Sequence, residues 1–420
     1  MTKLNSGIEG KGKVVPLLVT GLLIASVVAL VLNRSFYDRI AADAFFSITL
    51  GSTAIVFLQV RPRWEVLQLV IVTCFLVLIQ SFVLRVSLRS MPALALLGTG
   101  SLGLLAYRQT YGAGKERKLL YYAFFPSLLL VLLGYVSSSL LEITDRVHPS
   151  TLDLFLYRFD ASLGFQPSFD VAQVVLRSWW ITRIALLFYF ALPVPIMLIY
   201  AKQLARIGSG AMVVFLGFFI IGPAGVIFYN LLPACGPIYL FGARFPFEPF
   251  ATQQIKEMVL HPVAISGVRN AFPSLHVAWA LLASWYAEGL SNCTKVFGRI
   301  FLAGTVLACL GLGEHYFIDL IAAIPFAMMI QAACALQIPW LDRRRLMPFL
   351  AGLLLLLIWV VLLRGGLSIM WVSPLIPWTL IAGTVIPCVI LQSQLRRRLA
   401  AIVQRPELSG CFEATTRRKI

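Results

Sequence analysis

Two short motifs, FPSLH at residues 272–276 and EHYFID at residues 314–319, each stand at the start of a long apolar run. The first motif continues as VAWALLASWYA and the second as LIAAIPFAMMI, and together they contain His276 and His315, two of the four histidines of the chain. A polar group is costly in hydrocarbon, so an ionisable residue at the mouth of a membrane helix is a candidate functional residue. The motifs therefore predict two membrane helices that carry reactive groups at one end.

The composition of the whole chain predicts an all-α integral membrane protein. Of 420 residues, 59% are apolar and only 13% are charged, and the mean hydropathy is +0.87. Water-soluble domains carry roughly 25% charged residues, and a membrane helix needs about 20 apolar residues. About twelve transmembrane helices are expected, the first of them an uncleaved span rather than a signal peptide. The predicted spans are residues 14–33, 41–60, 66–84, 91–107, 119–141, 183–201, 211–232, 273–290, 297–313, 315–337, 347–363 and 371–392.

The distribution of basic residues predicts the orientation in the membrane. With twelve spans, 23 of the 35 Lys and Arg residues fall on the side that holds both termini. Short basic loops stay in the cytoplasm, so His276 and His315 are both expected at the extracytoplasmic face. The net charge of +17 is explained by this asymmetry and by contact with anionic lipid, so no nucleic-acid partner is expected. A bacterial inner membrane with a periplasmic site is the leading location, and a Golgi membrane with a lumenal site is the alternative.

Two segments on the outer side, residues 142–182 and 233–272, are longer than simple connections. The first, with its aromatic and basic residues, is expected to contain a helix in the membrane interface, and the second is expected to form an ordered cap. The seven cysteines are scattered and show no ligand spacing, so neither a disulfide framework nor a metal site is predicted. The expected regions are a four-helix N-terminal part (1–117), a catalytic core (118–337), two C-terminal helices (338–395) and a basic cytoplasmic tail (396–420).

The second motif has the spacing of a histidine with an orienting acid. His315 and Asp319 are four residues apart, which places them one turn apart on the same helix face. A carboxylate on one imidazole nitrogen leaves the other nitrogen as a nucleophile or base. Ser274 is well placed as an N-cap, and the N-terminus of the helix that holds His276 is suited to bind an anion. Phosphoryl transfer through histidine needs these parts: a nucleophile, its orienting acid and a second proton donor.

The two motifs resemble the core signatures of the type 2 phosphatidic acid phosphatase superfamily. LPACGPIY at residues 232–239 adds a resemblance to its inositol phosphorylceramide synthase branch. The likeness covers about residues 118–337, which would be the six-helix catalytic core. It implies that His315 attacks phosphorus to form a phosphohistidine, that Asp319 orients His315, and that His276 protonates the leaving oxygen and then activates the acceptor. No metal or other cofactor is implied.

The chain departs from the classical phosphatases at the cations that hold phosphate. A lysine followed six residues later by Arg-Pro does not occur, and the Ser-Arg expected before His315 is Ala308-Cys309. Arg269 and then Arg244 are the favoured replacements, and Tyr316 is a further expected substrate contact together with Ser274. The other outer-side candidates are Lys256, Arg158 and Arg183 as cations and His261 as a third histidine.

The leading interpretation is a membrane phosphotransferase that moves a phosphorylated headgroup, such as inositol phosphate, from a lipid donor to a ceramide-like hydroxyl acceptor. Its partners would be the two lipid substrates and the bilayer. A lipid phosphatase that acts on phosphatidate or a polyisoprenyl pyrophosphate is one alternative. A lipid transporter is another, although the polar residues gather at one membrane face and the two halves of the chain do not match.

Overall fold

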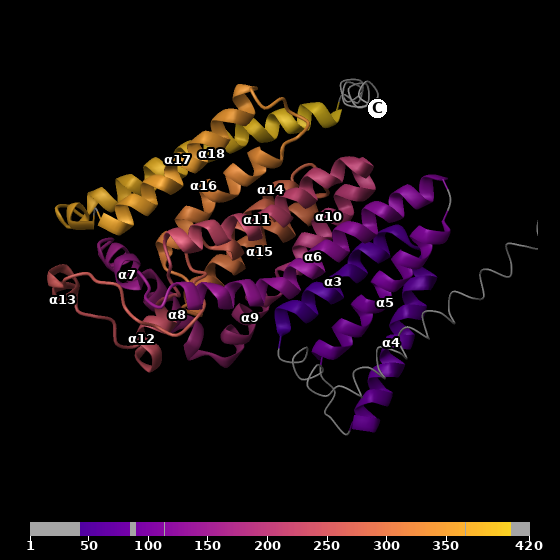
Figure 1. Ribbon diagram of the computed structural model, residues 1–420, viewed down its shortest axis with the longest axis horizontal. Coiled ribbons are helices and arrows are strands. Elements are labelled where there is room, and N and C mark those ends of the chain that lie inside the picture. Colours follow the sequence, from indigo (N-terminus) through magenta and orange to yellow (C-terminus); the bar gives the residue numbers. More distant parts are fainter. Residues whose placement is uncertain (1–42, 85–89, 113, 366, 405–420) are drawn as a thin grey trace, which may run out of the picture. The chain divides into compact units, whose positions relative to one another are not determined.

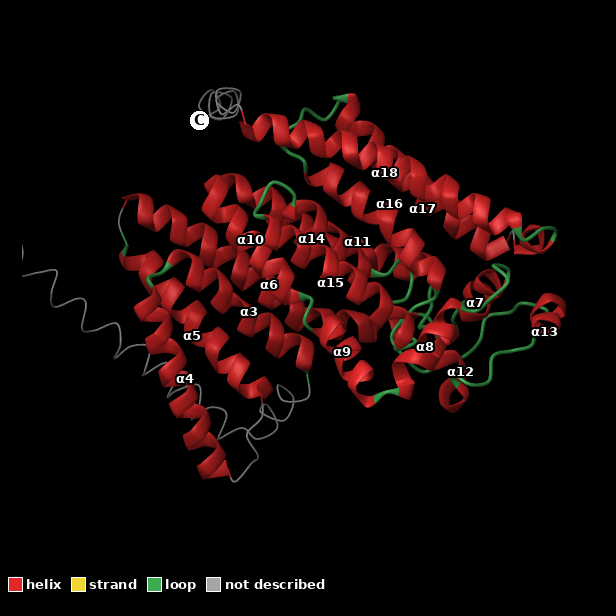
Figure 2. Cartoon of the chain, turned by 180° about the vertical axis from the view of Figure 1, so that it is seen from behind, coloured by secondary structure: helices red, strands yellow, loops and turns green. Residues whose placement is uncertain are grey.

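The computed structural model describes residues 43–84, 90–112, 114–365 and 367–404, which form helices joined by turns and loops (Figures 1 and 2). These residues contain no β-strand, and one isolated bridge joins Thr151 to Val263. The expected span at 14–33 and the basic tail beyond residue 404 lie outside the described residues. The all-helical prediction is confirmed for the described part of the chain.

The chain divides into two compact units. The first consists of residues 1–136 and 193–212, and the second consists of residues 137–192 and 213–420. The described helices of the first unit are α3 (Ala44–Val60), α4 (Arg63–Leu84), α5 (Ser90–Tyr111), most of α6 (Gly114–Val147), α10 (Pro193–Ile207) and η1 (Gly208–Ala211).

Close backbone packing joins α3 to α5 in the first unit. A Cβ atom built on Gly98 would lie only 2.0 Å from the Leu50 carbonyl oxygen, so glycine is required at this crossing. Small residues allow such close approach of helices in membranes. At one end of the pair, Glu65 of α4 accepts hydrogen bonds from Arg61 at 2.7 Å and from Arg108 at 2.8 Å.

The second unit contains the two motifs. Its long helices are α11 (Met212–Leu231), α14 (Leu275–Ala287), α15 (Asn292–Gly311), α16 (Phe317–Cys334), α17 (Arg343–Gly365) and α18 (Leu375–Gln404). Its shorter elements are α7 (Asp153–Ala161), α8 (Pro167–Arg177), α9 (Trp179–Phe190), α12 (Pro237–Phe241), η2 (Gly242–Arg244), α13 (Thr252–Glu257) and η3 (Leu367–Trp371).

Helix α16 lies at the centre of the second unit. It packs against α14, α17, α18 and α7, and it is buried along most of its length. Figure 1 shows α16, α17 and α18 side by side in orange to yellow. Figure 2 shows the green loops of this unit gathered around α7, α8, α12 and α13, at the end where α14 and α16 begin. The motif loops therefore belong to a loop-rich end of a helical bundle.

Six helical segments of the described chain are long and apolar enough to cross a membrane, which is consistent with a membrane protein. A seventh is added if α8 and α9, bent by 119° at Ser178, count as one broken span. The twelve spans and the six-helix core remain predictions. The six are Glu116–Val147, Pro193–Leu231, Asn292–Gly311, Phe317–Cys334, Arg343–Gly365 and Leu375–Ala400.

One detail of the expected organisation is wrong. Residues 183–201 do not form one helix, because α9 ends at Phe190 and α10 begins at Pro193. Proline lacks an N–H and disfavours helical geometry in the residue before it, so the break falls at Leu192. The interface helix expected within residues 142–182 stays a prediction. In this segment the rings of Tyr157 and Phe159 are buried in the protein, where Phe159 packs edge-on against Trp359.

Candidate functional site

The site begins with the two histidines, which the fold brings together. His276 lies in the first turn of α14, and His315 lies in the loop just before α16. Their ring centroids are 6.0 Å apart. A backbone hydrogen bond from Ser274 N to the Asp319 carbonyl (3.1 Å) joins the two motifs, and a second from His315 N to the Cys309 carbonyl (3.3 Å) joins the His315 loop to the end of α15. The two motifs therefore form one site, although 38 residues separate the histidines in the sequence.

His315 is held as a single tautomer by the backbone. Its Nδ1 is 3.0 Å from the carbonyl oxygen of Ala271, and a carbonyl only accepts, so Nδ1 carries the proton and donates. Its Nε2 is buried and has no hydrogen-bond partner among the described residues. Burial lowers the pKa of His315 to about 4, although Glu314 and the Ala271 carbonyl act in the opposite direction. A neutral imidazole with an unshared electron pair on Nε2 is the form that can act as a nucleophile.

Asp319 lies beside His315 but is not its hydrogen-bond acceptor. Asp319 Oδ2 is 3.6 Å from His315 Nδ1, which is too long for a hydrogen bond. The same oxygen accepts from Tyr316 N at 2.7 Å, whereas Oδ1 has no partner in the part of the chain that the structure describes. The Ala271 carbonyl therefore fixes the ring, and Asp319 supplies a buried carboxyl group one turn away. The orienting role of Asp319 stays a prediction.

His276 is positioned by an aromatic ring from a different helix. Tyr189 of α9 stacks on the His276 imidazole, with centroids 4.0 Å apart and an interplanar angle of 19°. The Tyr189 hydroxyl hydrogen-bonds to Glu314, and the hydroxyl of Tyr239 donates to Glu314 Oε2 at 3.3 Å. Burial raises the pKa of Glu314, and His315 and the two tyrosines oppose this effect. Tyr189 thus links His276 to the half-buried Glu314, which precedes His315 and also binds Tyr239.

Ser274 is the N-cap of α14, as the sequence predicts. Its side chain accepts from Val277 N at 3.4 Å, and its Oγ is 3.9 Å from the Cys309 sulfur. Cys309 is the residue that stands where the resemblance leads one to expect an arginine. A substrate contact by Ser274 remains a prediction, because the hydroxyl is fully buried between these partners.

The two favoured arginines have other partners. Arg269 is buried, forms an ion pair with Asp145, and donates from Nε to the His148 carbonyl at 2.9 Å. It thereby ties the loop before α14 to the C-terminal end of α6, where a cation also favours the helix dipole. Arg244 is exposed and lies over the rings of Phe241 and Phe250, 5.6 and 5.4 Å from their centroids. Their contacts with phosphate stay predictions.

Tyr316 belongs to a buried carboxylate network. Its hydroxyl donates to Asp153 Oδ1 at 2.9 Å, and the same oxygen accepts from Gly236 N at 2.8 Å. Gly236 has a φ of +129°, and a Cβ atom there would lie 2.5 Å from the Glu314 carbonyl oxygen. The LPACGPIY segment is thus pressed against the loop before His315. Tyr316 is expected to touch substrate, but in this structure its hydroxyl serves this network.

A second carboxylate of α7 completes the support of α16. Asp160 Oδ2 accepts from Phe317 N at 2.7 Å, and Oδ1 accepts from Ile318 N at 3.2 Å. Burial raises the pKa of both Asp153 and Asp160, and their backbone hydrogen bonds oppose this effect. The two residues are seven positions apart, which places them on one face of a helix. Two aspartates seven residues apart in an aromatic segment are the sequence signal for this role.

Other residues of the site have no signal in the sequence. Tyr189 is one of several aromatic residues in an apolar helix, and the Ala271 contribution is a backbone carbonyl. Ser168 Oγ donates to the His315 carbonyl at 2.9 Å, and the side-chain oxygen of Asn270 is buried without a described partner. These contacts depend on the tertiary fold alone.

Comparison with known proteins finds a family similarity in this region. Residues 154–335 match the model of the PAP2 superfamily. No curated protein and no solved structure matches the chain. The matched segment, here called the PAP2 domain, runs from α7 to the end of α16 and includes both histidines, Asp319 and Ser274. It indicates an enzyme with phosphatase or phosphotransferase chemistry on phosphorylated substrates.

Proposed function

We propose that the protein is a membrane phosphotransferase that moves a phosphorylated headgroup from a lipid donor to a lipid hydroxyl acceptor. The observation that carries the proposal is the buried Nε2 of His315, which has no hydrogen-bond partner among the described residues, in a ring whose centroid is 6.0 Å from that of His276. We further propose that the site opens to the extracytoplasmic face and that the donor headgroup is inositol phosphate, as in the branch that the motifs resemble.

The first half-reaction forms a phosphohistidine. The electron pair of His315 Nε2 attacks phosphorus, and the bond from phosphorus to the leaving oxygen of the donor breaks. His276, as the imidazolium, gives its proton to that oxygen, so a neutral alcohol leaves and His276 becomes neutral. Asp319 and the Ala271 carbonyl favour the positive charge that develops on the His315 ring as its Nε2–P bond forms.

The second half-reaction reverses these roles. Neutral His276 takes the proton of the acceptor hydroxyl, whose oxygen attacks phosphorus while the bond from phosphorus to His315 Nε2 breaks. The headgroup is then on the acceptor, and both histidines return to their starting states. The N-terminus of α14, capped by Ser274, has the free N–H groups and positive dipole that favour phosphoryl oxygens. Arg269 and Arg244 remain candidates for the same task.

The hydrolytic alternative uses the same site with water in place of the alcohol. Two features support transfer over hydrolysis as the main reaction: two phosphate-holding cations of the classical phosphatases are missing at their usual places in the sequence, and the motifs resemble a transferase branch. With water as the acceptor, the phosphorylated headgroup is released as a water-soluble product. With a lipid alcohol as the acceptor, the product is a new phospholipid. The products therefore separate the two reactions.

The test is product analysis with the purified full-length protein and defined lipids. Phosphatidylinositol labelled in its phosphate and a ceramide acceptor are expected to give a labelled new phospholipid and diacylglycerol, identified by mass spectrometry. His315→Ala is expected to abolish the reaction, and His276→Ala is expected to slow it about 10²–10⁴-fold, the usual range for general acid–base help. Acid-labile label on the protein, absent from His315→Ala, identifies the intermediate.

Three outcomes would overturn parts of the proposal. Water-soluble phosphate products without a new phospholipid would assign the protein to the phosphatases. Unchanged turnover in folded His315→Ala would exclude the nucleophile. Lipid movement across vesicles that is the same in wild type and His315→Ala, without product, would support the transporter alternative.

A further inference from the structure

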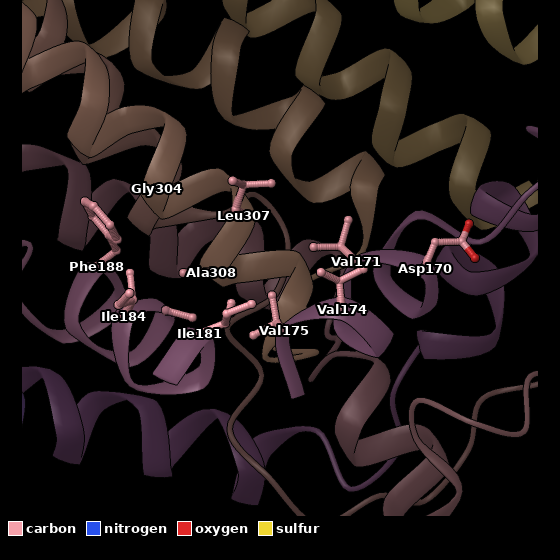
Figure 3. A pocket seen from close by; sticks show the side chains of 11 residues that line it. Asp170, Val171, Val174, Val175, Ile181, Ile184, Phe188, Gly304, Leu307 and Ala308 are labelled. Atoms are coloured by element: carbon pink, nitrogen blue, oxygen red, sulfur yellow. The ribbon is translucent and has the colours of Figure 1, made fainter. Parts of the chain in front are cut away.

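An apolar groove lies beside the proposed reaction centre. Helices α8 and α9 form an elbow of 119° at Ser178, and the C-terminal half of α15 passes across it. The cavity that they enclose has a volume of about 440 Å³. Figure 3 shows its lining, with Phe188 and Ile184 toward one end, Asp170 at the other, and Leu307 and Ala308 from α15 between them.

The chemistry of the lining suits hydrocarbon. Of the eleven lining residues, Asp170 is the one with a polar side chain, and the others are aliphatic, phenylalanine or glycine. Val174, Ile184 and Leu307 have exposed fractions of 63%, 53% and 54%. Helix α15 and the α8–α9 pair are apolar enough to cross a membrane, and in a bilayer these exposed side chains would meet hydrocarbon. The groove is thus open to lipid and offers little to a polar ligand.

The groove and the histidine site share their walls. Phe188 lines the groove, and the next residue, Tyr189, stacks on His276 at 4.0 Å. Ala308 lines the groove, and the next residue, Cys309, has its sulfur 3.9 Å from Ser274 Oγ. Helix α8 forms one wall of the groove, and Ser168 of the same helix donates a hydrogen bond to the His315 carbonyl.

We propose that this groove binds the hydrocarbon chain of the lipid substrate whose headgroup reacts at His315. This inference rests on the proposed function, because it assigns a binding site to the hydrocarbon part of the same lipid substrate. A volume of 440 Å³ lies in the range of small-molecule sites, roughly 300–1,000 Å³. That volume accommodates one flexible chain, whereas a helix, about 10 Å across, does not fit. A chain from the bilayer enters through the exposed side without passing through water, so dispersion contacts with the lining favour its binding.

Glycine at position 304 keeps the groove open. A Cβ atom there would lie 2.5 Å from the Phe188 ring, so a side chain would displace that ring. For a test, a substitution at an exposed lining position is preferable because it leaves the packing of α15 intact. Leu307→Trp fills the groove from its open side. Ile300→Trp is the matched control, since Ile300 is 57% exposed, lies two turns earlier on nearly the same face of α15, and does not line the groove.

The kinetic test compares donor lipids of different chain length in the purified enzyme. Leu307→Trp is expected to raise KM for a phosphatidylinositol with C16 chains about tenfold and to leave KM for its C6 analogue within twofold. Ile300→Trp is expected to leave both values unchanged. An equal change for both chain lengths in Leu307→Trp, or the same chain-length effect in Ile300→Trp, would overturn the assignment of the groove.

A binding test does not require turnover. Phosphatidylinositol with a diazirine near the end of one chain is photolysed in vesicles with the His315→Ala protein, and the labelled peptides are mapped by mass spectrometry. The proposal is supported if α8, α9 and the C-terminal half of α15 are labelled, and if an excess of unlabelled phosphatidylinositol, but not of phosphatidylcholine, prevents this labelling. Label that every phospholipid removes equally shows bulk lipid only and overturns it.

The two tests separate the groove from the reaction. Selective labelling with no product of transfer or hydrolysis would retain the groove as a lipid-binding site and reject the proposed function. Transfer without selective labelling, and without a chain-length effect of Leu307→Trp, would retain the function and reject the groove.

Discussion

At the scale of single residues, the partner of the His315 Nδ1 proton determines what His315 can do. The Ala271 carbonyl accepts a hydrogen bond from Nδ1–H, and Nε2 has no partner among the described residues. Asp319 Oδ2 lies 3.6 Å from Nδ1. The His-x-x-x-Asp spacing correctly places the two side chains as neighbours, but the hydrogen bond comes from a residue 44 positions away. The tautomer is thus set by backbone geometry.

The first prediction concerns pH. Burial lowers the pKa of His315 from its ordinary 6.5 to about 4. Protonation of Nε2 removes the electron pair that attacks phosphorus, so activity is lost as the pH falls through the folded-state pKa. Single-turnover formation of the phosphoenzyme is therefore expected to have its acid midpoint near pH 4.

Because Glu314 is a second ionisable group beside His315, and burial raises its pKa, the control is Glu314→Gln. It is expected to keep the same acid limb at a different absolute rate. An acid midpoint near 6.5 in the wild type would contradict the burial argument, and loss of the limb in Glu314→Gln would transfer it to the carboxyl group.

The second prediction concerns Tyr189, which positions His276 by stacking. Tyr189→Phe keeps the ring and loses the hydroxyl bond to Glu314, so a fall in kcat of about tenfold is expected, equivalent to about 1.4 kcal/mol for one hydrogen bond. Tyr189→Ala removes the stack and is expected to approach the loss seen in His276→Ala.

A double-mutant cycle distinguishes positioning from a general effect on the fold. If Tyr189 acts through His276, the variant with both residues changed to alanine is no slower than His276→Ala alone. Losses that simply add, or a melting temperature in Tyr189→Ala far below that of His276→Ala, would reject the positioning role.

At the scale of elements, α7 supports the loop that holds His315 and the start of α16. Its two carboxylates, Asp153 and Asp160, accept hydrogen bonds from backbone N–H groups of the 235–236 loop and of the first turn of α16. The N-cap residue of α16, Tyr316, supplies no side-chain cap of its own. A neighbouring helix therefore satisfies two donors that every helix start leaves open.

The third prediction tests this support. Asp160→Ala leaves the N–H groups of Phe317 and Ile318 buried without an acceptor, and the protein is expected to lose about 1–3 kcal/mol of unfolding free energy. A lowered melting temperature in detergent and a loss of turnover are both expected, because Asp319 lies in the same helix turn. Asp160→Asn keeps one acceptor oxygen and is expected to lose less. Equal melting temperatures for wild type and Asp160→Ala would contradict the capping role.

At the scale of the whole molecule, the orientation in the membrane determines which compartment supplies the substrates. The charge asymmetry predicts that the histidine end of the PAP2 domain is extracytoplasmic. Helix α15 is predicted to connect the two sides, since it contains the exposed Cys293 at its start, ends before the His315 loop, and has 20 residues that span about 30 Å.

The fourth prediction uses this geometry. The starting variant has Cys74, Cys293 and Cys411 changed to serine. When Val259→Cys is added, at a position that is 82% exposed, the new cysteine is expected to react with a membrane-impermeant maleimide in intact cells. A second variant that keeps Cys293 and has no cysteine at 259 is expected to react only after permeabilisation. The reverse pattern would place the site in the cytoplasm.

Hydrophobic length, capping and i, i+4 spacing act between near neighbours, so the sequence is enough to predict the helical class of the described chain, the N-cap at Ser274, and the proximity of Asp319 to His315. The helix predicted across 183–201 is wrong, because the break before Pro193 divides it. The hydrogen bond from His315 to Ala271, the stacking of Tyr189 on His276, and the capping of α16 by α7 arise from the tertiary fold. Each of these contacts joins residues far apart in the chain through backbone groups or ordinary aromatic rings, and such contacts have no local pattern.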